Sequence, residues 1–116
     1  MQTLQELAAA IDHLLLLCEA VAKAPGELGP RAALDVALAP LADRSFPQAC
    51  RDAAQELHGL ANMVHVQAGI LRERLAPRAD EPPEFTAFLV NKAKELMTIL
   101  PELRKAFDRH LPKPGT

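Results

Sequence analysis

The four histidines are the residues of this chain whose possible chemistry is easiest to assess. His58 and His65 are seven residues apart in a segment with a helical pattern, so their side chains point in similar directions but about 10 Å apart along the axis. Two histidines that bind one metal ion from a single helix are normally three or four residues apart. No aspartate or glutamate completes a ligand set with either one. We therefore predict no metal site and interpret both side chains as polar flanks of a helix.

The other two histidines do not indicate acid–base catalysis either. His13 lies beside Asp12, and His110 lies close to Asp108 in the sequence. Residues one or two positions apart face away from each other on a helix. Neither histidine is therefore expected to form a couple with its neighbouring carboxylate.

The two cysteines, Cys18 and Cys50, both fall on apolar stripes of helical spacing. Burial disfavours a thiolate, so neither is expected to act as a nucleophile. Two buried thiols in a reducing compartment are a better interpretation than a disulfide. The sequence also contains no glycine-rich phosphate loop and no evident pair of converging carboxylates. We therefore expect no catalytic residue, no cofactor and no enzymatic activity.

The composition is typical of a helical protein. Of the 116 residues, 49% are hydrophobic, mostly alanine and leucine, whereas tyrosine and tryptophan are absent. Alanine and leucine are strong helix formers, and few β-branched residues are present to build strands. The length suits one domain, which we place at residues 1–111, with a frayed tail at 112–116. We expect an all-α fold, an antiparallel four-helix bundle of three long helices and one short helix.

The charges narrow the class of partner. A net charge of −2 argues against a nucleic-acid partner, because phosphate binding needs a concentrated basic surface. The N-terminus lacks the basic region of a secretory signal, and Asp12, His13 and Glu19 interrupt the apolar run around Leu14–Leu17, which excludes a membrane span. We expect a cytoplasmic protein that binds neither nucleic acid nor membrane.

The first half of the chain contains signals for one long and one short helix. Thr3 and Glu6 have the spacing of a capping box, so the first helix should begin at about Leu4. The sequence Pro25-Gly26 should end it. A short helix is expected to open at Pro30 and to be stopped by Pro40.

The segment from Ser45 to Ala76 reads as a single long helix. Ser45 and Gln48 have the spacing of a capping box. Apolar residues then recur with the i, i+3, i+4, i+7 spacing of one buried helical face over about seven turns. The predicted buried stripe comprises Cys50, Ala53, Ala54, Leu57, Leu60, Ala61, Val64, Ala68, Leu71 and Leu75.

A second apolar line runs along the opposite side of this helix. Gly59, Met63, Val66 and Ile70 follow each other at spacings of four, three and four residues. Glycine inside a helix costs about 1 kcal/mol relative to alanine, a cost that is tolerated where another backbone must approach closely. Either neighbouring helices of the same chain cover this line, or it is a dimer face or a groove for a partner helix.

The remaining elements complete the predicted bundle. Leu16 and Leu17, on the far side of the first helix, are expected to extend the same surface. The proline-rich segment 76–83 is expected to be a connection. The last helix should run from Pro83 or Glu84 to about His110, with a kink or break at Pro101.

Part of the central segment resembles histidine phosphotransfer domains, which are four-helix bundles of similar length. Ala54, Leu57 and Gly59 match the alanine, leucine and glycine of the family motif Ala-His-x-Leu-Lys-Gly. Gln55 stands where the family has its phosphorylated histidine, and His58 replaces the lysine. The resemblance implies a signalling domain that lacks the phosphoacceptor.

A second resemblance is to HEPN ribonucleases, helical-bundle dimers with an Arg-x(4–6)-His motif. The spacings from Arg51 to His58 and from Arg104 to His110 fit this pattern. On one continuous helix, Arg51 and His58 would share a face. The resemblance implies a helical ribonuclease, although the residue after each arginine departs from the family pattern.

We weigh these alternatives against a non-enzymatic interaction module, which the second apolar line favours. The expected partner is another protein or a second copy of the chain, bound through the second apolar line and the two leucines on the far side of the first helix. The predicted contact residues are Gly59, Met63, Val66, Ile70, Leu16 and Leu17. An adaptor, a small chaperone or a regulatory subunit would fit this description.

Overall fold

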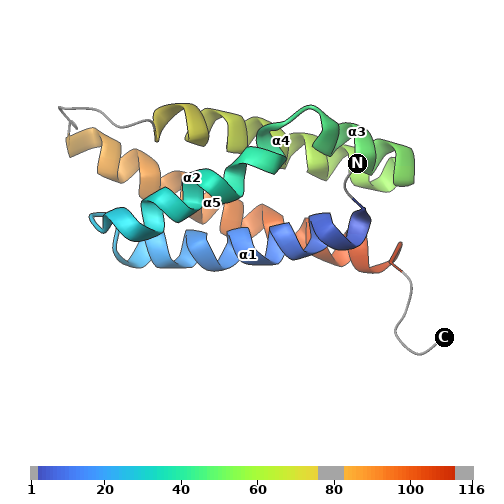
Figure 1. The fold of residues 1–116 in the computed structure, drawn as a ribbon, viewed down its shortest axis with the longest axis horizontal. Coiled ribbons are helices and arrows are strands. Elements are labelled where there is room, and N and C mark those ends of the chain that lie inside the picture. Colours follow the sequence, from blue (N-terminus) through green and yellow to red (C-terminus); the bar gives the residue numbers. More distant parts are fainter. Residues whose placement is uncertain (1–2, 76–82, 112–116) are drawn as a thin grey trace.

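The computed structural model describes residues 3–75 and 83–111, and the described chain is built from helices without strands. Five helices follow each other along the sequence (Figure 1). They are α1 (Leu4–Lys23), α2 (Leu28–Ala42), α3 (Ser45–Ala53), α4 (Gln55–Arg74) and α5 (Pro83–Asp108). The predicted all-α class is confirmed, but the described residues form five helices instead of the four that we expected. The predicted tail at 112–116 and most of the predicted connection lie outside the described residues.

Helix α1 begins where its capping signal predicts. The backbone N–H of Glu6 donates to Oγ1 of Thr3 at 3.1 Å, which satisfies one of the free donors of the first turn. The helix ends at Lys23, just before Pro25-Gly26. Lys23 is favourably placed in the last turn, where a positive charge interacts with the negative end of the helix dipole.

Helix α2 is longer than predicted at both ends. It begins at Leu28, so Pro30 lies within its first turn. The prediction that Pro40 stops the helix was wrong, because the helix continues to Ala42. Pro40 lies in the last turn, where the loss of one backbone donor interrupts only the final hydrogen bonds of the helix.

The predicted single helix from Ser45 to Ala76 is wrong, since the chain forms two helices that meet at Ala54. Ala54 has an extended backbone with φ of −165° and ψ of 139°. The bend allows α3 to pack against α4, α2 and α1 while Phe46 and Cys50 become fully buried. Burial of a large apolar side chain stabilises by about 1.5–3 kcal/mol, whereas the helix propensities of residues other than proline differ by about 1 kcal/mol or less. Ala53, predicted on the buried stripe, is exposed.

The predicted capping box at Ser45 and Gln48 was also wrong. The residue that caps α3 is Asp43, whose carboxylate accepts a hydrogen bond from the backbone N–H of Ser45 at 2.8 Å. That hydrogen bond lowers the pKa of Asp43, because it favours the charged carboxylate, and the nearby His65 adds a smaller effect in the same direction. Asp43, in the turn between α2 and α3, therefore provides the helix cap that was predicted for Ser45.

Helix α5 runs without a break through Pro101, from Pro83 to Asp108. Of the kink or break predicted near Leu100, the break is therefore absent. Phe85, at the start of the helix, and Phe107, near its end, are both buried, so the helix contributes to the core along its length. Packing along the whole helix compensates for the hydrogen bond that proline cannot donate.

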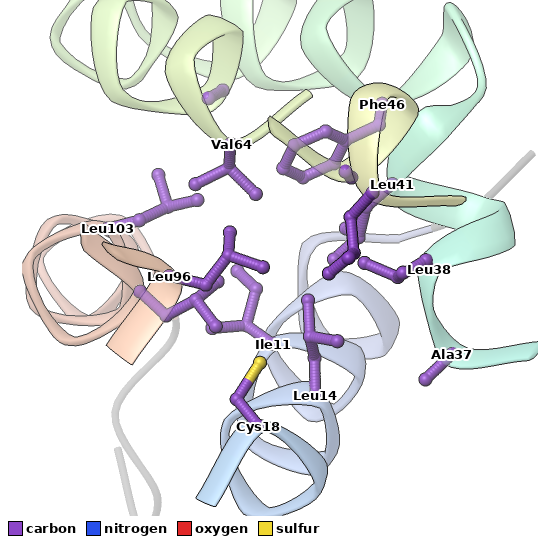
Figure 2. Packing of buried hydrophobic residues seen from close by; sticks show 14 of the residues in the cluster. Ile11, Leu14, Cys18, Ala37, Leu38, Leu41, Phe46, Val64, Leu96 and Leu103 are labelled. Carbon is purple, nitrogen blue, oxygen red and sulfur yellow. The ribbon is translucent and has the colours of Figure 1, made fainter. Parts of the chain in front are cut away.

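The helices pack around one interior. Helices α1 and α4 each contact α2, α3 and α5. Figure 2 shows side chains from all five helices pointing into the common core. They include Ile11 and Leu14 of α1, Leu38 and Leu41 of α2, Phe46 of α3, Val64 of α4, and Leu96 and Leu103 of α5. The buried residues of the described chain are all apolar, so the interior offers no polar site for chemistry.

None of the helices in the described ranges combines the length and the apolar character that crossing a bilayer requires.

Candidate functional site

Helix α4 presents two different apolar faces. Leu57, Ala61, Val64, Ala68 and Leu71 are fully buried and contribute to the core. The second line, which we call the α4 line, consists of Gly59, Met63, Val66 and Ile70 and faces outward. Met63 is 51% exposed, Val66 47% and Ile70 37%, so neighbouring helices leave much of this line uncovered.

Gly59 begins the α4 line and is exposed. A Cβ atom built at this position would meet nothing within 4 Å. No close approach within the described chain therefore requires a glycine here. Gly59 therefore costs about 1 kcal/mol of helix stability relative to alanine. The space above its backbone is open.

Polar contacts tie both ends of α4 to α5. At the start of α4, Glu56 accepts a hydrogen bond from the guanidinium of Arg109, and Nε2 of His110 lies 3.0 Å from its other carboxylate oxygen. At the end of α4, the guanidinium of Arg74 lies over the ring of Phe88, 5.3 Å from its centroid. The α4 line thus has Glu56 near one end, and Arg72, Glu73 and Arg74, with one net positive charge, near the other.

The opposite flank of α4 contacts α2. Nδ1 of His65 lies 2.9 Å from the backbone oxygen of Leu41, and a carbonyl can only accept, so this nitrogen carries the proton. Leu41 is in the last turn of α2, where carbonyl groups lack helical partners. Arg72 adds a partly exposed ion pair with Asp35 at 3.7 Å. His65 therefore caps a neighbouring helix, and both flanks of α4 are held in a fixed register.

Leu16 and Leu17 lie on α1, which is separated from α4 by α2 and α5. The backbones of α1 and α4 do not approach each other within the described part of the chain. Leu16 is 64% exposed, whereas Leu17 packs partly against the core. The structure therefore brings together the four residues of the α4 line but places these two leucines on another helix.

The most exposed large apolar side chains are on α2, which the sequence analysis did not single out. Leu28 is 74% exposed and Val36 is 73% exposed. Apart from Arg31 and Asp35, the fifteen residues of α2 are apolar, glycine or proline. Arg31 lies over the ring of Phe85 of α5, and Asp35 pairs with α4, so neither shields the outward face. The scarcity of polar residues in this helix was the signal that could have identified it.

The residues behind the phosphotransfer resemblance lie at the start of α4. Gln55, in the phosphoacceptor position, is the first residue of the helix and is exposed. His58, in the position of the family's lysine, is partly buried. Within the described ranges, no group of three or more histidine, cysteine, aspartate or glutamate side chains is placed to hold a metal ion.

The two arginine–histidine spacings behind the ribonuclease resemblance do not form equivalent sites. Arg51 is in α3 and His58 is in α4, so the extended residue between these helices removes the shared face that we predicted. Nε of Arg104 donates to Asp12 at 3.1 Å, whereas His110 contacts Glu56. The second arginine and histidine are therefore engaged with different carboxylates.

Both thiols are fully buried and free, as predicted. Burial raises the pKa of Cys18 to about 12, and the negative charge of Glu19 acts in the same direction. Burial alone raises the pKa of Cys50 to about 12. At neutral pH both side chains are protonated and behave as small apolar core residues.

No protein-family model, curated protein or solved structure matches this chain.

Proposed function

We propose that this protein is a non-enzymatic interaction module that binds another protein chain through the α4 line. The observation that carries the proposal is the pair of apolar faces on α4, one fully buried and one substantially exposed. A helix in a small globular protein needs only one apolar face for folding. The second face adds nothing to the core, and it has the spacing with which helices recognise one another.

We further propose that α1, α2, α4 and α5 form an antiparallel four-helix bundle and that α3 is a short addition to it. Two observations support this arrangement. Figure 1 shows α1 and α4 running in one direction and α2 and α5 in the other. The backbone of each of these four helices lies close to two of the others, whereas the backbones of the pairs α1–α4 and α2–α5 do not approach each other in the described chain. Such a frame holds the α4 line in place without help from a partner.

The composition of the α4 line suits a contact surface. Met63 is flexible and polarisable, so it adapts to the shape of a partner. Val66 and Ile70 are β-branched and lose little side-chain entropy when they become buried. Burial of each apolar side chain contributes up to about 1.5–3 kcal/mol before the cost of association is subtracted. An adaptor, a small chaperone or a regulatory subunit would use such a surface.

The test is a charge placed at the centre of the α4 line. Val66→Glu should abolish the association of the protein, measured by light scattering and by co-purification from its own cells, while far-UV circular dichroism stays unchanged. Val36→Glu is the matched control, because it places the same charge on an exposed valine of α2. This control should retain the association.

Two results would contradict the proposal. If Val66→Glu unfolds the protein, the α4 line contributes to the core and the exposed face has been misassigned. If the variant stays folded and associates as tightly as the wild type, the contact surface lies elsewhere. Loss of association in the α2 control alone would point to the surface around Val36.

A further inference from the structure

We propose that the occupant of the α4 line is a second copy of this chain, packed antiparallel to the first about a two-fold axis. This inference rests on the proposed function, since it names the partner of the same surface. The sizes and charges of residues along α4 are complementary to the same helix turned end to end, as a two-fold contact requires.

The sizes of the side chains follow this symmetry. Gly59 and Ile70 are at opposite ends of the α4 line, and Met63 and Val66 lie between them. Both pairs have their midpoint between residues 64 and 65. When an identical helix is laid antiparallel across this point, Ile70 of each copy faces Gly59 of the other, and Met63 faces Val66. The open space above Gly59 can then receive the larger side chain.

The charges follow the same symmetry. Glu56 and Arg74 are 18 residues apart, which is five helical turns, so they project from the same side of α4. Their midpoint is residue 65, almost the same point as for the apolar pairs. An antiparallel dimer therefore brings Glu56 of each copy towards Arg74 of the other. Glu56 also contacts Arg109 and His110 of its own chain, so these charges set the direction of packing more than its affinity.

A parallel pair would not have these properties. It would leave Glu56 of each copy about 27 Å along the helix axis from Arg74 of the other, so these opposite charges could not pair. It would also leave the two copies of Gly59 facing each other across an unfilled gap, while the two copies of Ile70 compete for space. The pattern of α4 therefore specifies the antiparallel direction.

Disulfide trapping distinguishes the two directions. Gly59→Cys and Ile70→Cys are purified separately, one with an affinity tag, then mixed and oxidised briefly. The mixture should form a cross-linked dimer with one copy of each variant. Each variant alone should not cross-link, because its two thiols would be about 16 Å apart along the helix axis, beyond the reach of a disulfide. The native thiols are buried and should not interfere.

The matched control replaces Gly59→Cys by Val36→Cys, an exposed position on α2 that should not cross-link to Ile70→Cys. Light scattering should give the mass of a dimer for the wild type, and Val66→Glu should weaken the dimer by about 100-fold or more. Circular dichroism checks that each cysteine variant is folded.

Three outcomes would overturn this inference. A wild-type protein that is monomeric at every accessible concentration excludes the second copy but leaves a different protein as the partner of the α4 line. Cross-linking of Gly59→Cys with itself, at least as efficient as in the mixture, would show parallel packing. A dimer that survives Val66→Glu would remove the α4 line from the interface, and with it the proposed function.

Discussion

Helices α2 and α4 both expose large apolar side chains, yet the two surfaces are organised differently. On α2, Leu28 and Val36 are the most exposed large apolar side chains of the described protein. They are two turns apart, and Ala32, a small residue, lies between them. On α4, the exposed large side chains are less accessible but closer together, because Met63, Val66 and Ile70 follow each other at spacings of three and four residues. Exposure alone therefore does not identify a binding face.

The charges around the two surfaces differ as well. The polar residues of α2 are directed towards the neighbouring helices, where Arg31 lies over a phenylalanine ring and Asp35 pairs with Arg72. The α4 line has Glu56 near one end and the exposed residues Arg72, Glu73 and Arg74, with one net positive charge, near the other, and Glu56 and Arg74 remain partly accessible to a partner. A line of closely spaced apolar side chains with charges near its ends is therefore a better sign of a contact surface than the exposure of single residues.

The largest expected effect separates the two faces of α4. Leu57→Ala, on the buried face, should lower the free energy of unfolding by about 2–5 kcal/mol, because it removes buried apolar contacts and leaves a cavity. Val66→Ala, on the exposed face, should change it by less than about 0.5 kcal/mol in the monomer. Urea denaturation followed by circular dichroism measures both. Equal losses would mean that the two faces do not have separate roles.

The thiols provide a second contrast between interior and surface. Cys18 and Cys50 should react slowly with a thiol reagent in the native protein and rapidly in denaturant, because both are buried with a pKa of about 12. An engineered thiol at Val66, on the exposed face, should react rapidly in the native monomer. Rapid native labelling of either cysteine would show that the helix carrying it opens readily.

The same two thiols predict a loss of stability at high pH. In the unfolded chain they ionise near the ordinary cysteine pKa of 9.0, whereas in the folded protein they stay protonated until about pH 12. The unfolded state then binds fewer protons, so stability should fall as the pH rises from about 9 to 12. Replacing both cysteines by alanine should reduce the slope of this decline. An identical slope in the variant would assign the decline to other groups.

The smallest expected effect on stability is at His65, which lies on the flank of α4 that contacts α2. His65→Ala should lower the free energy of unfolding by about 1 kcal/mol, because the carbonyl of Leu41 loses its hydrogen-bond donor. His58→Ala, on the same helix, is the control and should cost less. Denaturant titration at constant pH compares the two. A larger cost at His58 would show that His65 does not hold α2 in place.

The sequence predicted those features that depend on periodicity and local chemistry. The spacing of Leu57, Val64 and Leu71 identified the buried face of α4, and Thr3 identified the start of α1. The bend at Ala54 was not predictable in this way, because alanine favours a continuous helix and only the burial of Phe46 and Cys50 in the folded chain opposes it.

The candidate surface was predictable only in part. The spacing of Gly59, Met63, Val66 and Ile70 identified a line, but their exposure depends on how the other helices pack. Apolar spacing alone could not decide whether Leu16 shares a surface with this line, since α1 and α4 carry similar apolar patterns although their backbones do not approach each other in the described chain. The cap at Asp43 was missed because both Asp43 and Ser45 favour helix starts, and the turn geometry selects between them.

The most direct test of the α4 line as a contact surface is its accessibility inside the cells that produce the protein. Thiols are introduced singly at Val66 and at Val36, two valines that are both exposed in the isolated chain. Their labelling rates are then compared in living cells and in dilute purified protein. If the α4 line is a contact surface, the thiol at position 66 should be labelled much more slowly in cells than in dilute purified protein. The thiol at position 36 should be labelled at the same rate in both conditions. Equally rapid labelling at 66 in cells and in dilute solution would contradict it.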